Sequence, residues 1–284
     1  MTTAPVRGER AARAALSHFR RPESIAAELA RLGPVELWAK LLRDDPAGRL
    51  RGYEPERELV TAERTADFVI PGDAAWPAAL DALAEARPLG VWTRGRGDLA
   101  ALSARAVAVT GRRAPSPSGV RAAQDTARSL TEAGHTVASA LSYGIDTAAQ
   151  YAAAAPTLAV MPCGLDTCHP YNQAELLARV TAHAGLAVSL YRPGTPTSRL
   201  TLSTTARLLA ALSRALVLIE PSDDVATVPL EAAREARHVR RPVHVLTTTD
   251  PSTNIRHTSR TGRLLKSVRA HRTTKLSDIV TALG

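Results

Sequence analysis

The stretch AVAVTGRR at residues 106–113 decides the fold. Its first five residues are small, apolar or β-branched, which predicts a short strand buried on both faces. The glycine and two arginines that follow end this strand, and a helical pattern runs on from them. The pattern then repeats, because HTVAS at 135–139 predicts a second strand and YGID at 143–146 leads into a second helix. This repeat predicts two parallel strands whose following loops meet at the carboxyl edge of one sheet.

The turn at Gly111-Arg112-Arg113 contains the residue types that bind phosphate. Glycine lets a ligand approach backbone N–H groups, the following helix adds partial positive charge at its N-terminus, and two guanidinium groups stand beside both. The spacing from Gly111 to Gly119 does not match the dinucleotide motif G-x-G-x-x-G, and the chain has no G-x-x-x-x-G-K-[ST] motif. The alternative interpretation is that Gly111 only makes the bend and that the arginines are solvated.

Strands and helices continue to alternate after residue 146. Four further apolar runs predict strands, at residues 157–161, 186–190, 215–219 and 243–246. Helical patterns lie between them, and a last helix is expected from about Ser277. Six parallel strands joined by crossover helices predict an α/β fold, an extended Rossmann-like doubly wound parallel sheet.

Two smaller regions precede this sheet. Residues 1–65 form a pattern of short amphipathic helices, with Gly33-Pro34 separating two of them, and predict a small N-terminal helical (SAM-like) domain. Residues 66–105 are expected to be a connecting segment with two short strands. We therefore divide the chain into a helical module at 1–65, a connecting segment at 66–105 and a Rossmann-like domain at 106–284.

The 284-residue chain carries a net charge of +9 that is unevenly placed. Residues 234–284 hold 11 basic and 3 acidic side chains, which favours a polyanionic partner; a solvated basic tail is the plainer interpretation. The two cysteines, Cys163 and Cys168, are too few for a zinc site and indicate a reducing compartment. Without an apolar run of membrane-spanning length or a signal peptide, we expect a soluble, intracellular protein. Because the nucleotide-binding fingerprints and metal-ligand groupings are missing, we expect no metal or cofactor.

Ligands of doubly wound sheets bind outside the carboxyl ends of the strands. The loops expected there are rich in small residues, hydroxyl groups and arginines. Asp146 has a simpler interpretation as the cap of its own helix, with its carboxylate accepting backbone N–H groups. The candidates for contact with phosphate or DNA are Gly111, Arg112, Arg113, Ser116, Gly119, Ser139, Gly144, Ile145, Asp146, Gly164, Arg199 and Arg207.

Several ordered motifs resemble those of the DNA-processing protein A (DprA/Smf) family. VAVTGRR at 107–113 resembles the family's first-strand motif, and the segment from Ser139 through YGID to Ala149 resembles S-G-x-A-x-G-I-D-x-x-A-H. CGLD at 163–166 resembles C-G-L-D-x-x-Y-P, and YRPGTP at 191–196 resembles Y-P-P-G-T-P. The resemblance covers nearly the whole chain in order.

This resemblance implies a cytoplasmic, non-catalytic protein that binds and protects incoming single-stranded DNA. Family members form homodimers and help to load a RecA-type recombinase during natural transformation and related recombination. Carried over by position, the family's DNA pocket corresponds here to Gly111, Arg113, Ser139, Gly144, Asp146 and Arg207.

The chain departs from the family pattern at several pocket positions. Thr205-Ala206 stand where the family has Arg-Asn, and Thr227-Val228 stand where it has Ser-Gly. Ala140 replaces a glycine and Gln150 replaces a histidine. Each lost charged hydrogen bond to phosphate removes roughly 1.5–3 kcal/mol. We therefore expect weaker or differently placed DNA binding, with the additional cation of Arg112 offsetting part of the loss.

Two other functions fit the same fold. A divergent member without DNA binding would serve as a nucleotide-sensing or protein-interaction module, which the change at Thr205-Ala206 motivates. An enzyme resembling the Lonely Guy nucleotide phosphoribohydrolases would need P-G-G-x-G-T-x-x-E after a late strand. The corresponding stretch, EPSDD at 220–224, has no paired glycines, although Glu220 and Asp224 offer two carboxylates.

Overall fold

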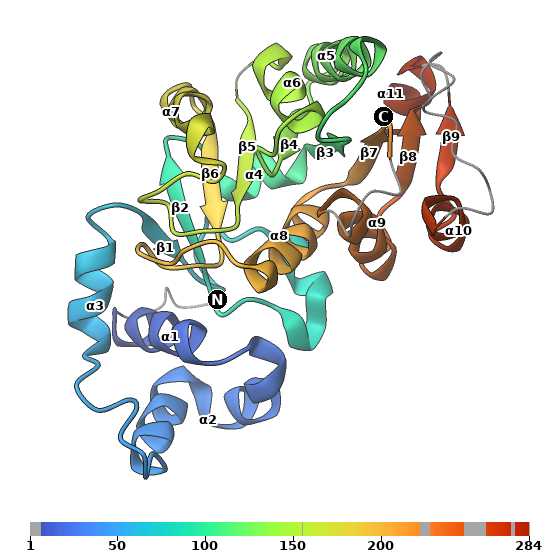
Figure 1. The fold of residues 1–284 in the computed structure, drawn as a ribbon. Helices are drawn as coiled ribbons and strands as arrows, with labels where there is room; N and C mark the ends of the chain where they lie inside the picture. The colour runs from blue at the N-terminus through green and yellow to red at the C-terminus, as the bar shows by residue number, and fades with distance from the viewer. Residues whose placement is uncertain (1–6, 155, 222–227, 247–259, 274–275, 284) are drawn as a thin grey trace.

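A nine-stranded sheet organises the protein, which we describe from a computed structural model (Figure 1). The structure describes residues 7–154, 156–221, 228–246, 260–273 and 276–283. Across the sheet the strand order is β1-β2-β6-β5-β4-β3-β7-β8-β9. The strands are β1 (Asp67–Val69), β2 (Val91–Gly95), β3 (Ala106–Gly111), β4 (Thr136–Ser139), β5 (Leu158–Met161), β6 (Leu186–Ser189), β7 (Ala215–Ile219), β8 (Val243–Leu246) and β9 (His271–Thr273).

The six expected parallel strands, β3 to β8, are confirmed. From β3 the chain builds outward through β4, β5 and β6, and then returns to place β7 on the other side of β3. Strand order therefore reverses between β3 and β7, which is the point where doubly wound sheets bind ligands. These strands are buried on both faces because helices cover both, which explains their continuous apolar sequences.

Both edges of the sheet extend beyond the six parallel strands. β2 pairs antiparallel with β6 and β1 pairs antiparallel with β2, so the segment expected to connect two domains adds two strands to the sheet. At the opposite edge β9 pairs parallel with β8. The sequence did not predict β9, because its three residues, HRT, contain no apolar run.

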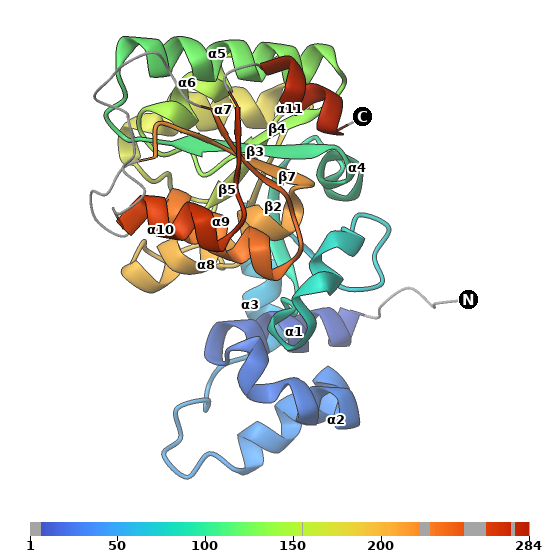
Figure 2. The same cartoon turned by 90° about the vertical axis from the view of Figure 1, so that its right-hand side faces the viewer.

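Helices cover the sheet in two layers (Figure 2). On one face lie α5 (Pro117–Glu132), α6 (Ile145–Ala152), α7 (Ala174–Ala182) and α11 (Leu276–Leu283). On the other lie α8 (Arg199–Leu212), α9 (Val228–His238) and α10 (Arg260–Ser267), with the short α4 (Leu99–Ala104) and the 3-10 helix η1 (Ala78–Ala86) nearby. Alanine-rich helix faces, such as Ala123 and Ala127 of α5, pack directly on the strands. None of the described helices is both long and apolar enough to cross a membrane.

Three helices lie before the first strand, within residues 7–62, and we call them the helical module. Its helices are α1 (Arg7–Phe19), α2 (Pro22–Arg43) and α3 (Pro55–Ala62). Gly33, with φ of 74°, interrupts α2 where the sequence predicted a break. Leu16, Leu37 and Trp38 belong to the separate core of this module. The mixed charged stretch that contains α3 did not predict a helix.

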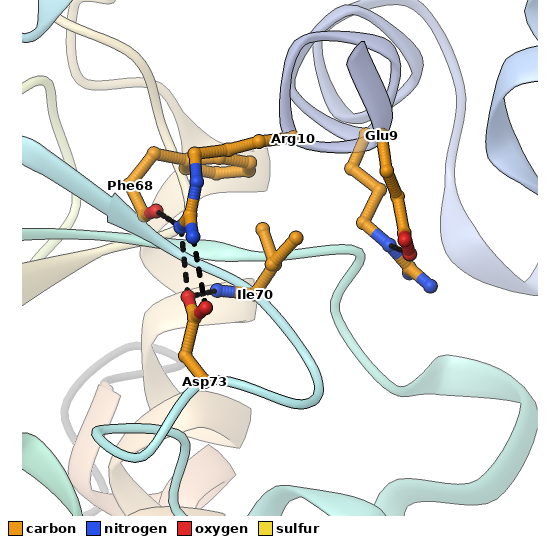
Figure 3. Close-up of polar contacts among 6 residues, drawn as sticks. Glu9, Arg10, Phe68, Ile70 and Asp73 are labelled. Carbon is orange, nitrogen blue, oxygen red and sulfur yellow. Dashed lines mark hydrogen bonds and ion pairs between the residues drawn. The ribbon is translucent and has the colours of Figure 1, made fainter. Parts of the chain in front are cut away.

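Arginines fasten the helical module to the sheet (Figure 3). Arg10 of α1 makes two hydrogen bonds to the carboxylate of Asp73, at 2.7 and 2.8 Å, and a third to the carbonyl oxygen of Phe68. Asp73 also accepts the N–H of Ile70, at 2.8 Å. Arg192, which follows β6, reaches back to Glu58 of α3 at 3.0 Å. A bidentate arginine–carboxylate pair fixes orientation as well as distance. These contacts therefore hold the helical module in a defined orientation against the sheet.

Arg10→Met should destabilise the protein by roughly 1.5–3 kcal/mol, because it leaves Asp73 and the Phe68 carbonyl without their cationic donor. Arg13→Met is the matched control, since Arg13 pairs only with Glu9 one turn away on the same helix. Such a pair contributes roughly 0.3–0.5 kcal/mol. Urea unfolding of both variants measures the difference; equal losses would show that the Arg10 contacts do not hold the module.

Candidate nucleic-acid interface

Gly111 ends β3 at the reversal point and lies against the neighbouring strand β7. A Cβ atom added there would come within 1.9 Å of the carbonyl oxygen of Ile219. The next residue, Arg112, donates its backbone N–H to that same oxygen at 3.2 Å. Gly111 is therefore required because two backbones meet, rather than because a phosphate approaches it. This supports the alternative interpretation of the glycine, that it makes the bend.

A protein carboxylate occupies the N-terminus of α5, where the sequence suggested phosphate. Glu220, which directly follows β7, accepts the backbone N–H of Ser116 at 2.9 Å and the hydroxyl hydrogen of the same residue. A Cβ at Gly119 would lie 2.4 Å from the carboxylate carbon of Glu220. Glu220 thus supplies the negative charge that a helix N-terminus favours. The backbone donors of Ser116 and Gly119 are satisfied within the protein.

Asp146 is a brace between loops and does not cap its own helix, which corrects the simpler prediction. The N-cap of α6 is Gly144. The buried Asp146 carboxylate accepts the hydroxyl hydrogen of Thr110 at 2.7 Å and the N–H of Ala140 at 3.1 Å. It therefore ties the end of β3 to the loop after β4. Burial raises its pKa to about 6, against the opposing effect of these hydrogen bonds.

This pKa predicts a pH dependence of stability. The folded protein binds the Asp146 proton more tightly than the unfolded chain, whose pKa is near the ordinary value of 3.8. Protonation therefore favours folding, and this contribution is lost as the pH rises through about 6. Relative to Asp146→Asn, the wild-type free energy of unfolding should fall by roughly 3 kcal/mol between pH 3 and 7. Urea titrations across this range measure it; parallel curves for the two proteins would contradict the shift.

Four other candidate residues have structural roles in the loops at this edge of the sheet. Gly144, with φ of 80°, lies where a Cβ would come within 2.4 Å of the Arg112 carbonyl oxygen. The buried Ser139 hydroxyl accepts the N–H of Leu141 at 3.2 Å. Ile145 is fully buried in the core, and Gly164 is in contact with the backbone that follows β6. These residues shape the loops that carry the exposed side chains.

Arg113 and neighbouring aromatic residues form the exposed part of the edge, which we call the Arg–Tyr cluster. The guanidinium of Arg113 lies 5.9 Å from the ring centre of Tyr143, within reach of a cation–π interaction. The Tyr143 hydroxyl donates to the side-chain oxygen of Asn172, and the adjacent Tyr171 is 87 % exposed. Burial, followed by the positive charge of Arg113, lowers the pKa of His169. The cluster thus consists of Arg113, Tyr143, His169, Tyr171 and Asn172.

The sequence did not single out the two tyrosines as candidates. Tyr143 lies inside a motif whose glycine and aspartate drew attention, and Tyr171 follows a loop chosen for Gly164. The signal was present, because exposed tyrosines beside arginines are a common feature of surfaces that bind single strands. Only the fold shows that the loop after β4 brings the Tyr143 ring beside Arg113, and that Tyr143 contacts Asn172, the neighbour of Tyr171.

The remaining arginine candidates lie in different surroundings. Arg199 is exposed at the first turn of α8, and Arg112 is half-buried beside the turn. Arg207 contacts two carboxylates, Glu23 of α2 and Glu235 of α9, and lines a groove of about 340 Å³ between the helical module and α8. The structure therefore gives Arg207 a role in docking the module and does not place it in the Arg–Tyr cluster.

The positions that depart from the family pattern are partly explained by burial. Thr205 and Ala206 are buried in α8, where the Thr205 hydroxyl donates to the Thr201 carbonyl oxygen at 2.7 Å. Asp224 and Thr227 lie outside the described residues. In the described part of the chain, no three His, Cys, Asp or Glu side chains gather closely enough to hold a metal ion.

The architecture defines a Rossmann-like α/β protein. At the carboxyl edge of its sheet it presents an arginine and exposed tyrosines, and the carboxylates of Glu220 and Asp146 hold the nearby turns in place. The sequence profile of a family described as DNA recombination-mediator protein A matches residues 67–284. The chain belongs to this family.

Curated relatives agree with this membership. A DprA protein of Mycobacterium tuberculosis (strain ATCC 25618 / H37Rv) is 33% identical over 220 residues, covering 69% of this chain and 56% of the relative. Protein Smf of Synechocystis sp. is 27% identical over 211 residues, covering 72% and 52%. The chain thus spans about half the length of these curated relatives.

Two solved structures share the fold. DNA processing protein A of Streptococcus pneumoniae superposes with a TM-score of 0.78 and 20% identity, covering 98% of each chain. That of Helicobacter pylori, solved in a study of its single-stranded DNA binding mode, superposes with a TM-score of 0.63 and 24% identity. The second match covers 73% of this chain and 92% of the other.

Proposed function

We propose that this protein binds single-stranded DNA through the Arg–Tyr cluster and serves as a recombination mediator. The observation that supports it is the pairing of the exposed Arg113 with Tyr143, with the exposed Tyr171 next to the Tyr143 partner Asn172, in a protein of this family. A guanidinium binds a phosphate through parallel hydrogen bonds, and aromatic rings stack on bases without regard to sequence. Together they suit a flexible strand of any sequence.

The chemistry of the edge favours binding over catalysis. Its two buried carboxylates, Asp146 and Glu220, both accept hydrogen bonds from protein donors that hold the turn in shape. A general base must instead reach a substrate proton. We therefore propose a non-catalytic role in the cytoplasm, in which a homodimer covers incoming single-stranded DNA and passes it to a RecA-type recombinase.

A salt series with a labelled oligothymidine tests the binding. Phosphate contacts release counterions, so the logarithm of the association constant should fall linearly with the logarithm of salt concentration. On single strands the slope is about −0.7 for each phosphate neutralised. Fluorescence anisotropy at several salt concentrations, with duplex DNA as comparison, measures the slope and the preference. Absence of binding at low salt would end the proposal and favour a protein-interaction module.

A further inference from the structure

Four arginines mark the amino-terminal edge of the sheet, opposite the Arg–Tyr cluster. Arg105 directly precedes β3 and Arg214 directly precedes β7. Arg240 stands shortly before β8, and Arg269 shortly before β9. We call these four residues the arginine row. Each one lies where a strand begins, whereas the candidates discussed above lie where strands end.

The topology places the members of the row side by side. β3, β7, β8 and β9 are consecutive neighbours in the sheet, and all three pairings are parallel. Their first residues therefore lie at one edge. Neighbouring strands are about 4.8 Å apart, so the row extends over about 14 Å before the reach of the side chains is added. Four neighbouring strands therefore each have one arginine at or shortly before their first residue, at the same edge of the sheet.

All four side chains are exposed. Within the described residues, none of them forms an ion pair. Acidic residues of adjoining elements include Asp98, which caps α4, Glu132, which ends α5, and Glu235 of α9, which pairs with Arg207. Burial and then the charges of Arg214 and Arg105 lower the pKa of His135, the residue before β4, so the fields of two members of the row overlap.

Two members of the row occupy backbone positions that favour glycine. Arg240 and Arg269 have φ of 57° and 53°, the left-handed conformation that closes a helix. Arg241 donates its N–H to the Ala236 carbonyl oxygen at 2.7 Å, and Ala270 donates to Leu265 at 2.9 Å, as such closures require. The equivalent position after α5 is Gly134, with φ of 80°. Arginine is thus present at two places where the backbone disfavours it, which suggests that the side chain is needed.

We propose that the arginine row is a second DNA-binding surface, which contacts the sugar–phosphate backbone of a DNA segment at the amino-terminal edge of the sheet. Guanidinium groups match phosphate geometry and keep their charge at any physiological pH. A row of cations on neighbouring strands fits a partner with regularly repeated negative charges, which nucleic acid provides. This surface is separate from the Arg–Tyr cluster, and its existence does not rest on the function proposed for that cluster.

The double variant Arg240→Gly/Arg269→Gly tests the proposal without endangering the fold. Glycine relieves the left-handed backbone at both positions, so the melting temperature should be unchanged or higher. DNA affinity at low salt should fall at least fivefold. The slope of the salt plot should become shallower by about 1.4 on single strands and about 1.8 on duplex DNA, because two phosphate contacts are lost. Separate titrations with oligothymidine and with a duplex show which form of DNA the row contacts.

Ala184→Gly is the matched control. Ala184 follows α7 with φ of 57°, so glycine there relieves the same backbone conformation without removing a charge. It should leave DNA affinity and the salt slope at wild-type values. Wild-type affinity and slope for both forms of DNA in the double arginine variant would overturn the proposal.

An Arg113→Ala background separates the two surfaces. If the Arg–Tyr cluster does not bind DNA, Arg113→Ala leaves affinity unchanged, while the row substitutions still reduce it. If both surfaces bind, the row substitutions reduce affinity further in the Arg113→Ala background. If Arg113→Ala reduces DNA affinity and the row substitutions do not, the proposal for the arginine row is wrong, whereas the proposal for the Arg–Tyr cluster stands.

Discussion

Arg113→Ala/Tyr143→Ala should weaken single-stranded DNA binding roughly a hundredfold or more at low salt. Loss of a charged hydrogen bond to phosphate costs roughly 1.5–3 kcal/mol, and loss of one base stacked on an aromatic ring costs roughly 1–3 kcal/mol. Each 1.4 kcal/mol is about tenfold in affinity. Both side chains are exposed, so the fold should remain intact. Anisotropy titration with oligothymidine gives the affinity, and circular dichroism verifies folding.

The control for this pair is Arg179→Ala/Tyr151→Ala. Arg179 lies 5.6 Å from the ring centre of Tyr151, so this pair repeats the cation–π geometry of Arg113 and Tyr143 with residues of α6 and α7. It has the same chemistry but does not belong to the Arg–Tyr cluster. We expect its removal to leave DNA binding unchanged. A similar loss in both double variants would show that diffuse surface charge, rather than the cluster, holds the strand.

Gly111→Ala should have the largest effect on stability. The added methyl group would come within 1.9 Å of the Ile219 carbonyl oxygen. A Cβ has a fixed position on its Cα and the oxygen is held in the β3–β7 pairing, so side-chain rotation cannot relieve the clash. Overpacking in a core typically costs roughly 1–3 kcal/mol, and a backbone clash of this size belongs at or above the upper end. The melting temperature should fall by roughly 6–12 °C. Differential scanning calorimetry measures it.

Gly8→Ala is the comparison for that substitution. A Cβ at Gly8, in α1, would meet nothing within 4 Å. Alanine is favoured over glycine in a helix by roughly 0.5–1 kcal/mol, so this variant should be neutral or slightly more stable. A fall in melting temperature for Gly8→Ala equal to that for Gly111→Ala would mean that the close contact between β3 and β7 does not decide the result.

The sequence predicted the architecture because burial on both faces has a strong signature. Strands such as AVAVT and ALVLI can lie only in a covered sheet, and the alternation with helices then sets parallel topology. β9 and α3 were missed for the converse reason. β9 is short and polar at the sheet edge, and α3 is a short charged helix whose Leu59 and Ala62 alone face the interior.

The site was less accessible to sequence reasoning. The sequence shows backbone donors at a glycine-containing turn but does not show which acceptor occupies them. Phosphate and carboxylate fit the same donors, and the acceptor Glu220 lies 104 residues from Ser116. Likewise, Arg207 matches the family pattern by position, yet two carboxylates from other helices engage it. Long-range partners of this kind are set by the fold, so local motifs cannot assign them.

The carboxylates of Glu220 and Asp146 have a consequence for how a strand is received. Both carboxylates accept backbone N–H groups of the loops around Arg113. These loops therefore do not need a bound ligand to keep their shape. A DNA strand would bind to a surface that already has its final conformation. Binding would therefore cost the protein little conformational entropy. Association would then be limited by encounter and orientation, and successive strands could exchange without the loops folding and unfolding each time.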